Sequence, residues 1–195
     1  MKVPCNACGA PILETTAARN GGVCLPCKSG RRASIEASKA SHQRERELDA
    51  TDPSRIYWRS LIARIYGDDG GIERLSDVEK QYWAVGCLAD EVYNGGFDQF
   101  FFNSSGEHYE WAVVGLESMG ATHSLELLKK AKQILFGFGS VPVDTWTRRQ
   151  RVIQMRPDDR RLDALDGRFC ADPDRLSDRC QAFALHHGLF QSEGS

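Results

Sequence analysis

Four of the seven cysteines in this 195-residue chain lie in two pairs near its N-terminus. Cys5 and Cys8 form one C-x2-C pair, and Cys24 and Cys27 form the second pair 15 residues later. Two cysteines three positions apart let one tight turn point both sulfurs at a single ion, and two such turns complete a tetrahedral shell of thiolates. The spacing therefore predicts one structural Zn²⁺ per chain, because four protein ligands leave no coordination position open for chemistry.

Two disulfides or four unconnected thiols are the alternative interpretations of this quartet. The large apolar side chains between the pairs are few, chiefly Ile12, Leu13 and Val23. A module of about 30 residues with so small a core needs a cross-link or a bound metal to fold. A metal ion can fill this role because its binding and the folding of the module are then a single event. We therefore predict a zinc ribbon over residues 1–30.

The rest of the chain offers little for catalysis. His108 stands beside Glu107 and could act as a general acid or base, but we favour its interpretation as a surface histidine at a helix start. Cys87, Cys170 and Cys180 fall on apolar helical faces, where cysteine behaves as a small hydrophobic residue. No phosphate-binding loop, zinc-protease motif or nucleophile elbow occurs. We expect no catalytic residues, and thus a protein that is not an enzyme.

Two further regions follow the cysteine module. Residues 31–51 are mostly charged or small, so they predict either a solvated helix or a flexible linker. From residue 52 to 190 apolar residues recur at helical spacing, and strand-like alternation is hard to find. The fold class expected from the sequence is an all-α helical domain with a small N-terminal zinc-ribbon module.

Local signals place seven helices in this domain. Asp52-Pro53 is typical of a helix start, and Gly67 begins a break. Ser76 to Glu79 forms a capping box that begins the second helix, which Asn94-Gly95-Gly96 should stop. Further helices are expected at about 107–119, from Thr122, after Asp144, around 162–169, and from Asp172-Pro173.

The most unusual stretch, NGGFDQFFFNSS, runs from Asn94 to Ser105 and contains four phenylalanines within six residues. In one interpretation the rings pack between helices while asparagine side chains cap the turn. In the other, Gln99, Asn103 and exposed ring faces form a partner site. The motif positions are Asn94, Gly95, Gly96, Phe97, Gln99, Phe100, Phe101 and Asn103.

This stretch, together with the later run from Leu162 to Phe169 (LDALDGRF), resembles the bacterial DNA-mimic protein family. The resemblance covers most of residues 55–190 and implies an all-helical fold. A named member is known for presenting acidic side chains, in place of DNA phosphates, to a DNA-binding repressor. The resemblance therefore implies a non-catalytic protein-binding role. The ribbon is similar to short caps that precede several bacterial domains, some near toxin–immunity genes, so a toxin-immunity-type protein is an alternative.

The charge distribution agrees with a local acidic surface. The chain has a formal net charge of −2. This value excludes a protein that is strongly acidic over its whole length and a strongly basic nucleic-acid binder. Residues 52–126 contain 13 acidic and 5 basic residues, whereas the segments on either side are mildly basic. We expect an acidic face for a cationic partner, a DNA-binding protein or a toxin, and its candidates are Asp68, Asp69, Glu73, Asp77 and Glu79.

Two remaining expectations concern nucleic acid and location. Arg19, Lys28, Arg31 and Arg32 lie on or near the ribbon, so direct nucleic-acid binding through the ribbon and linker is an alternative function. No run approaches the roughly 20 apolar residues of a membrane helix, and the N-terminus lacks the apolar region of a signal peptide. We expect a cytoplasmic protein with no membrane partner. The identity of a protein partner is not encoded in these patterns.

Overall fold

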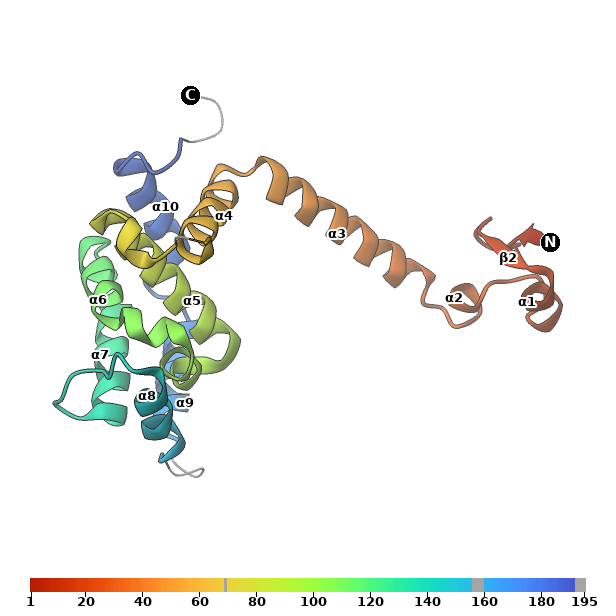
Figure 1. Cartoon of the computed structure of the whole chain (residues 1–195). Coiled ribbons are helices and arrows are strands. Elements are labelled where there is room, and N and C mark those ends of the chain that lie inside the picture. The colour runs from red at the N-terminus through yellow and green to blue at the C-terminus, as the bar shows by residue number, and fades with distance from the viewer. Residues whose placement is uncertain (69, 156–159, 192–195) are drawn as a thin grey trace. The chain divides into compact units, whose positions relative to one another are not determined.

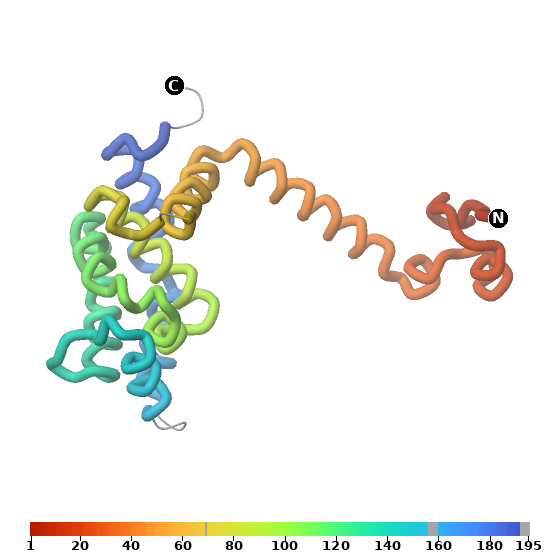
Figure 2. The backbone as a smooth tube through the Cα atoms, in the orientation of Figure 1, coloured from red at the N-terminus to blue at the C-terminus, as the bar shows by residue number. Residues whose placement is uncertain are grey.

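The computed structural model describes residues 1–68, 70–155 and 160–191. The chain separates into two compact units, Met1–Asp52 and Pro53–Ser195. Figures 1 and 2 show the elements of each unit in order along the chain. None of the helices in the described ranges combines the length and apolar character needed to cross a bilayer.

Unit 1 begins with a small hairpin. Strand β1 (Lys2–Pro4) pairs antiparallel with β2 (Pro11–Leu13), and Val3 lies opposite Ile12. Two short helices, α1 (Glu14–Arg19) and α2 (Leu25–Lys28), follow the hairpin.

The charged segment of unit 1 is a helix, α3 (Arg32–Thr51), with no buried residue. Glu36 pairs with Arg32 at 3.0 Å and with Lys39 at 3.3 Å, and Gln43 donates to Glu47 at 2.7 Å. Such pairs three or four residues apart stabilise an exposed helix. Of the two interpretations of this segment, the solvated helix is therefore the one observed.

Unit 2 is all-α, as the apolar periodicity predicted. Its elements are α4 (Pro53–Tyr66), η1 (Ile72–Arg74), α5 (Asp77–Phe102), η2 (Ser104–His108), α6 (Tyr109–Ser118), α7 (Thr122–Phe136), α8 (Thr145–Ile153), α9 (Arg161–Cys170) and α10 (Leu176–His186). Helix α5 contains a large part of the core and packs against α6, α8, α9 and α10.

Two of the predicted helix starts have their caps in place. The Ser76 hydroxyl accepts from the Glu79 amide at 3.3 Å, and the Glu79 carboxylate accepts from the Ser76 amide at 2.8 Å, which completes the capping box. The Asp144 carboxylate accepts from the Thr147 amide at 2.7 Å at the start of α8.

The last helix starts later than predicted. Helix α10 begins at Leu176 rather than at Asp172-Pro173. Arg175, immediately before the helix, has a left-handed backbone with φ of 53°, which is incompatible with an earlier helical turn. The Asp172 carboxylate instead accepts from the Leu176 amide at 2.8 Å, so it caps a helix that begins four residues further on.

The second helix is interrupted at Asn94-Gly95-Gly96, as predicted, but the sequence did not predict the helical segment that follows directly. Gly96 breaks the helical geometry, with φ of 89° and ψ of 178°, but helix resumes at once and continues to Phe102. The Phe97 amide donates to the Asp166 carboxylate of α9 at 2.9 Å. This carboxylate, 69 residues away in the sequence, caps the second segment, so the glycines separate two helical segments of α5 that meet at a kink.

Aromatic rings fill the core around this kink. Phe97, Phe100 and Phe101 are fully buried. Phe97 meets Phe169 edge-on at 5.4 Å, and Phe101 meets Phe136 in the same way at 5.2 Å. Edge-to-face contacts of this kind add to the stabilisation from apolar burial. After the kink, Phe97 therefore packs against α9, Phe101 packs against α7, and Phe100 packs against Phe101.

Candidate functional site

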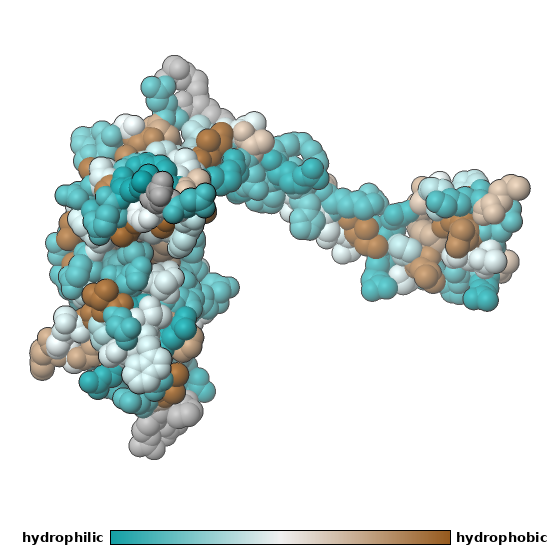
Figure 3. Space-filling view, viewed as in Figure 1, coloured by the Kyte–Doolittle hydropathy of each residue, from teal (hydrophilic) through white to brown (hydrophobic). Residues whose placement is uncertain are grey.

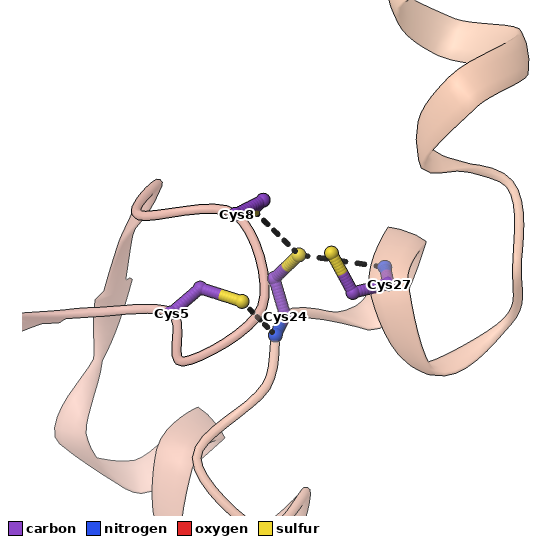
Figure 4. A group of neighbouring side chains, drawn as sticks. All are labelled: Cys5, Cys8, Cys24 and Cys27. Carbon is purple, nitrogen blue, oxygen red and sulfur yellow. Dashed lines mark hydrogen bonds between the residues drawn. The ribbon is translucent and has the colours of Figure 1, made fainter.

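The four paired cysteines converge in unit 1. Their sulfur atoms all lie within 4.8 Å of one another, and Cys8 Sγ lies 3.7 Å from Cys24 Sγ. Figure 4 shows the side chains turned toward one another. A tetrahedral shell with Zn–S bonds of about 2.3 Å would separate the sulfurs by about 3.8 Å. The quartet is therefore a group that could hold a metal ion, with Cys5 and Cys24 buried.

Backbone amides and one arginine donate to these sulfurs. The Cys24 amide donates to Cys5 Sγ at 3.2 Å, and this contact chiefly lowers the pKa of Cys5 to about 6. Arg32, the first residue of α3, donates to Cys8 Sγ at 2.7 Å and lowers the pKa of that thiol. Both contacts favour thiolates, which are the form that binds a metal. By contrast, hydrogen bonding with Cys24 raises the pKa of Cys27 to about 12.

The polar side chains of the phenylalanine-rich motif are used internally. Glu91 accepts from Gln99 Nε2 at 2.6 Å, from Asn103 Nδ2 at 2.9 Å and from the Ser105 hydroxyl at 3.0 Å. Gln99 Oε1 in turn accepts from Asn94 Nδ2 at 3.1 Å. The buried rings and these closed contacts support the structural interpretation of the motif. Glu91, three residues before Asn94, is the central acceptor of these contacts.

Close packing explains the two glycines of the motif. A Cβ on Gly95 would lie 2.1 Å from Gln99 Oε1, and a Cβ on Gly96 would lie 2.5 Å from Asp166 Oδ2. Gly96 also has the positive φ that favours glycine. Asp166 belongs to the other family motif, Leu162 to Phe169, and its bond to the Phe97 amide connects α9 to the kink of α5.

The end of α5 is held by a buried arginine that sequence reasoning missed. Arg148 of α8 is 0% exposed. Its guanidinium donates to the carbonyl oxygens of Phe101 and Asn103 at 2.8 Å, and to those of Pro142 and Val143 at 2.9 and 3.0 Å. A cation at a helix C-terminus satisfies carbonyls that have no partner within the helix. No local sequence signal distinguishes Arg148 from its neighbouring arginines.

The structure removes Glu79 from the proposed acidic face. Glu79 is only 9% exposed, because its carboxylate pairs with Arg64, accepts from the Tyr57 hydroxyl at 2.8 Å and completes the capping box. Burial opposes ionisation, but the Arg64 guanidinium and the Ser76 amide prevail and lower the pKa of Glu79 to about 2. Its role is therefore to join α4 to the start of α5.

The other described members of the predicted acidic face are exposed to solvent, unlike Glu79. Asp68, Glu73 and Asp77 are exposed, while Asp69 lies outside the described residues. Lys80 Nζ lies 3.3 Å from Glu73 and 3.8 Å from Asp77, and it also sits 5.0 Å above the Trp111 ring of α6. Lys80 thus offsets part of the negative charge and connects this cluster to α6, where Glu110 and Glu117 are also exposed.

The histidine predicted at the surface is buried. His108 is among the buried polar residues, and burial lowers its pKa even though Glu107 lies 3.5 Å from Nε2. It was predicted to be exposed because it opens a helix, but η2 packs closely against α5 there. Among the described residues, Glu107 is the carboxylate that lies within 4 Å of the His108 imidazole.

A second group with catalytic residue types has a structural geometry. The Ser124 hydroxyl donates to Asp174 at 2.9 Å, and the Ser124 amide donates to the same oxygen at 2.7 Å. His123 contacts the other carboxylate oxygen at 3.4 Å. Because the serine bonds the carboxylate rather than the imidazole, the order differs from a serine–histidine–carboxylate triad, in which the histidine activates the serine. Asp174 instead caps the first turn of α7.

Comparison with known proteins gives one family. The model of the DMP19-like protein family matches residues 73–187. No curated protein and no solved structure matches the chain. The match begins at η1 and ends just after α10, so it spans the kinked α5, the buried Arg148 and the Asp166 contact. Because it covers more than half of the sequence, the chain belongs to the DMP19-like protein family.

Proposed function

We propose that this chain is a non-catalytic protein-binding protein whose helical unit presents exposed carboxylates to a DNA-binding protein. Membership of a DNA-mimic family carries this proposal, since it supports a DNA-mimic protein-binding role at the family level. Carboxylates on a protein surface can occupy the cationic groups with which a partner binds DNA phosphates. A cationic toxin, as in the toxin-immunity alternative, is the second partner class that such a face fits.

The acidic face of this proposal consists of Asp68, Glu73 and Asp77, with Asp69 as a fourth candidate that lies outside the described residues. Glu73 and Asp77 are highly exposed, and η1 and the first turn of α5 position them. Lys80 moderates their charge, so a partner cation must compete with Lys80 for both carboxylates. Replacing Lys80 by Met keeps an apolar stem over Trp111 and should strengthen capture of a cationic partner.

The test begins with capture of a partner from a lysate of the native host, followed by titration of the purified partner. The triple variant Asp68→Asn/Glu73→Gln/Asp77→Asn should weaken binding at least tenfold, and duplex DNA should displace the wild-type chain. The control variant Glu126→Gln/Asp163→Asn/Asp178→Asn removes three exposed carboxylates from α7, α9 and α10. Equal loss in both variants, or a partner that DNA does not displace, would contradict the proposal.

We further propose that Cys5, Cys8, Cys24 and Cys27 bind one structural Zn²⁺. The support is the convergence of four sulfurs and the spacing of 3.7 Å between two of them. The ion would staple the hairpin to α2, and Arg32 would balance part of the excess negative charge of four thiolates. Metal analysis of the purified protein should give about one zinc per chain, and Cys8→Ser with Cys27→Ser should abolish it, whereas Cys170→Ser should not.

A further inference from the structure

Helix α8 presents large apolar side chains to solvent. Trp146 is 69% exposed and Ile153 is 61% exposed. They lie seven residues apart and so fall on one face of the helix, with Arg149 between them. Phe102, at the end of α5, is 36% exposed and lies 4.8 Å beneath the Arg149 guanidinium. We call these four residues, Phe102, Trp146, Arg149 and Ile153, the α8 ridge.

The ridge has the composition of a binding surface. Tryptophan and arginine are the residue types enriched among interface residues that contribute most to affinity. Exposed apolar clusters on a soluble domain commonly mark interaction sites. Figure 3 shows brown and pale side chains interrupting the hydrophilic surface over the part of unit 2 where Figure 1 places α8. The core of unit 2 does not use these side chains.

Arg149 is held in a fixed position with donors to spare. Its Nε donates to the Phe102 carbonyl oxygen at 2.9 Å, and its guanidinium stacks on the Phe102 ring. Within the described residues its two Nη nitrogens form no hydrogen bond. A planar guanidinium with free donors matches a carboxylate in a two-point contact. The ridge therefore offers a carboxylate site between apolar side chains.

A polar depression of about 510 Å³ adjoins the ridge. Phe102 and Val152 form its apolar edge, and Asn94, Asp98 and Gln99 line its polar side. The Asn94 and Gln99 amides bond to each other and to Glu91, so they form a fixed polar wall beside the apolar edge. The depression thus extends the ridge toward the kink of α5.

We propose that the α8 ridge and this depression dock a protein segment that carries a carboxylate beside a large apolar side chain. The Arg149 guanidinium supplies the complementary charge. A nucleic acid is bound by several cations along its phosphates, whereas Arg149 offers one guanidinium and Asp98 lines the depression, so a peptide with a single carboxylate matches this surface better than a nucleic acid.

This surface is separate from the acidic face. Asp77 and Gly96 lie 19 residues apart in the first segment of α5, which corresponds to about 28 Å along the helix axis. A partner on one surface leaves the other accessible, and the two surfaces prefer opposite charges. The inference therefore goes beyond the proposed function and does not depend on it.

The test is selection from a displayed library of random 12-residue peptides against the full chain. The enriched peptides should carry Asp or Glu next to Leu, Ile, Phe or Trp. A labelled peptide from the selection should then bind wild type, and Trp146→Ala should weaken it at least tenfold in fluorescence anisotropy. Arg149→Lys keeps the charge but loses the fork, and should weaken it at least fivefold. Thr147→Ala, on another exposed face of α8, is the matched control.

Each other outcome overturns the proposal. Selection may enrich no acidic peptide, or the selected peptide may bind Trp146→Ala as tightly as it binds wild type. A labelled single-stranded oligonucleotide that binds more tightly than the peptide, with the same loss in Trp146→Ala, would assign the ridge to nucleic acid. Self-association of wild type that Trp146→Ala abolishes in sedimentation would assign it to a second copy. Circular dichroism and melting temperature verify that the variant is folded.

Discussion

Gln99 Nε2 donates a hydrogen bond of 2.6 Å to the Glu91 carboxylate, and the two residues lie on opposite sides of the kink in α5. Asn103 and Ser105 donate to the same carboxylate. One acidic side chain thus joins the first segment of α5 to the second segment and to the start of η2.

Replacing Glu91 by Gln should lower the free energy of unfolding by about 2 kcal/mol or more, because hydrogen bonds to a charged acceptor are stronger than those to an amide. Urea unfolding at neutral pH measures the change. Asp90→Asn is the control, since burial raises the pKa of Asp90 and its charge already disfavours the folded state. A loss of stability in Asp90→Asn equal to that in Glu91→Gln would contradict the assignment.

Replacing Gly96 by Ala should also destabilise unit 2, by about 2 kcal/mol or more. The new Cβ would lie 2.5 Å from Asp166 Oδ2 in a residue with φ of 89°, and it would disturb the bond from Phe97 to Asp166. Gly167→Ala, inside α9 with nothing within 4 Å of the added carbon, should instead stabilise by about 0.5–1 kcal/mol. Thermal unfolding of both variants tests the difference in sign.

Removing the Arg148 guanidinium should cost about 3–5 kcal/mol, because Arg148→Met leaves buried carbonyl oxygens without donors. At this chain length the melting temperature of unit 2 should fall by about 2–4 °C for each kcal/mol. Arg151→Met, at an exposed position of the same helix, should change it little. A small effect of Arg148→Met would show that water replaces the guanidinium.

Glu79 should make stability depend on pH in the acid range. Its pKa of about 2 in the folded chain lies below the ordinary value of 4.5, so its contribution is present above about pH 5 and is lost as the pH falls toward 2. The contribution is up to about 3 kcal/mol. Glu79→Gln should therefore be less stable than wild type at pH 6, and urea unfolding should show the difference shrinking at pH 4 and pH 3. A difference that stays constant with pH would assign the effect to packing.

Arg32 should support the cysteine quartet if zinc binds there. Arg32→Gln removes the donor to Cys8 Sγ and should weaken zinc affinity about tenfold or more in competition with a chelator. Arg31→Gln, one residue earlier, is the control and should leave the affinity unchanged. Wild type that binds no zinc would refute the metal site itself, whereas equal affinities in the two variants would refute only the role of Arg32.

The sequence by itself determined those features that depend on neighbouring residues. The Ser76 and Asp144 caps marked helix starts because each cap joins residues three positions apart. The cysteines of each pair are also three positions apart, and the motif spacing predicted that the two pairs meet, as the four sulfurs do. The apolar periodicity of residues 52–190 likewise predicted an all-α unit, since helical hydrogen bonds are local.

Only the tertiary structure decided the roles that depend on distant partners. Asp166 caps the helical segment after the glycine break from 69 residues away, and Arg148 donates to the Phe101 carbonyl oxygen from 47 residues away. Contacts with Arg64 and Tyr57 bury the Glu79 carboxylate, so Glu79 is not part of the exposed acidic face. A carboxylate that binds a partner and one that anchors a helix are identical in sequence, and only packing determines whether solvent or a buried donor satisfies it.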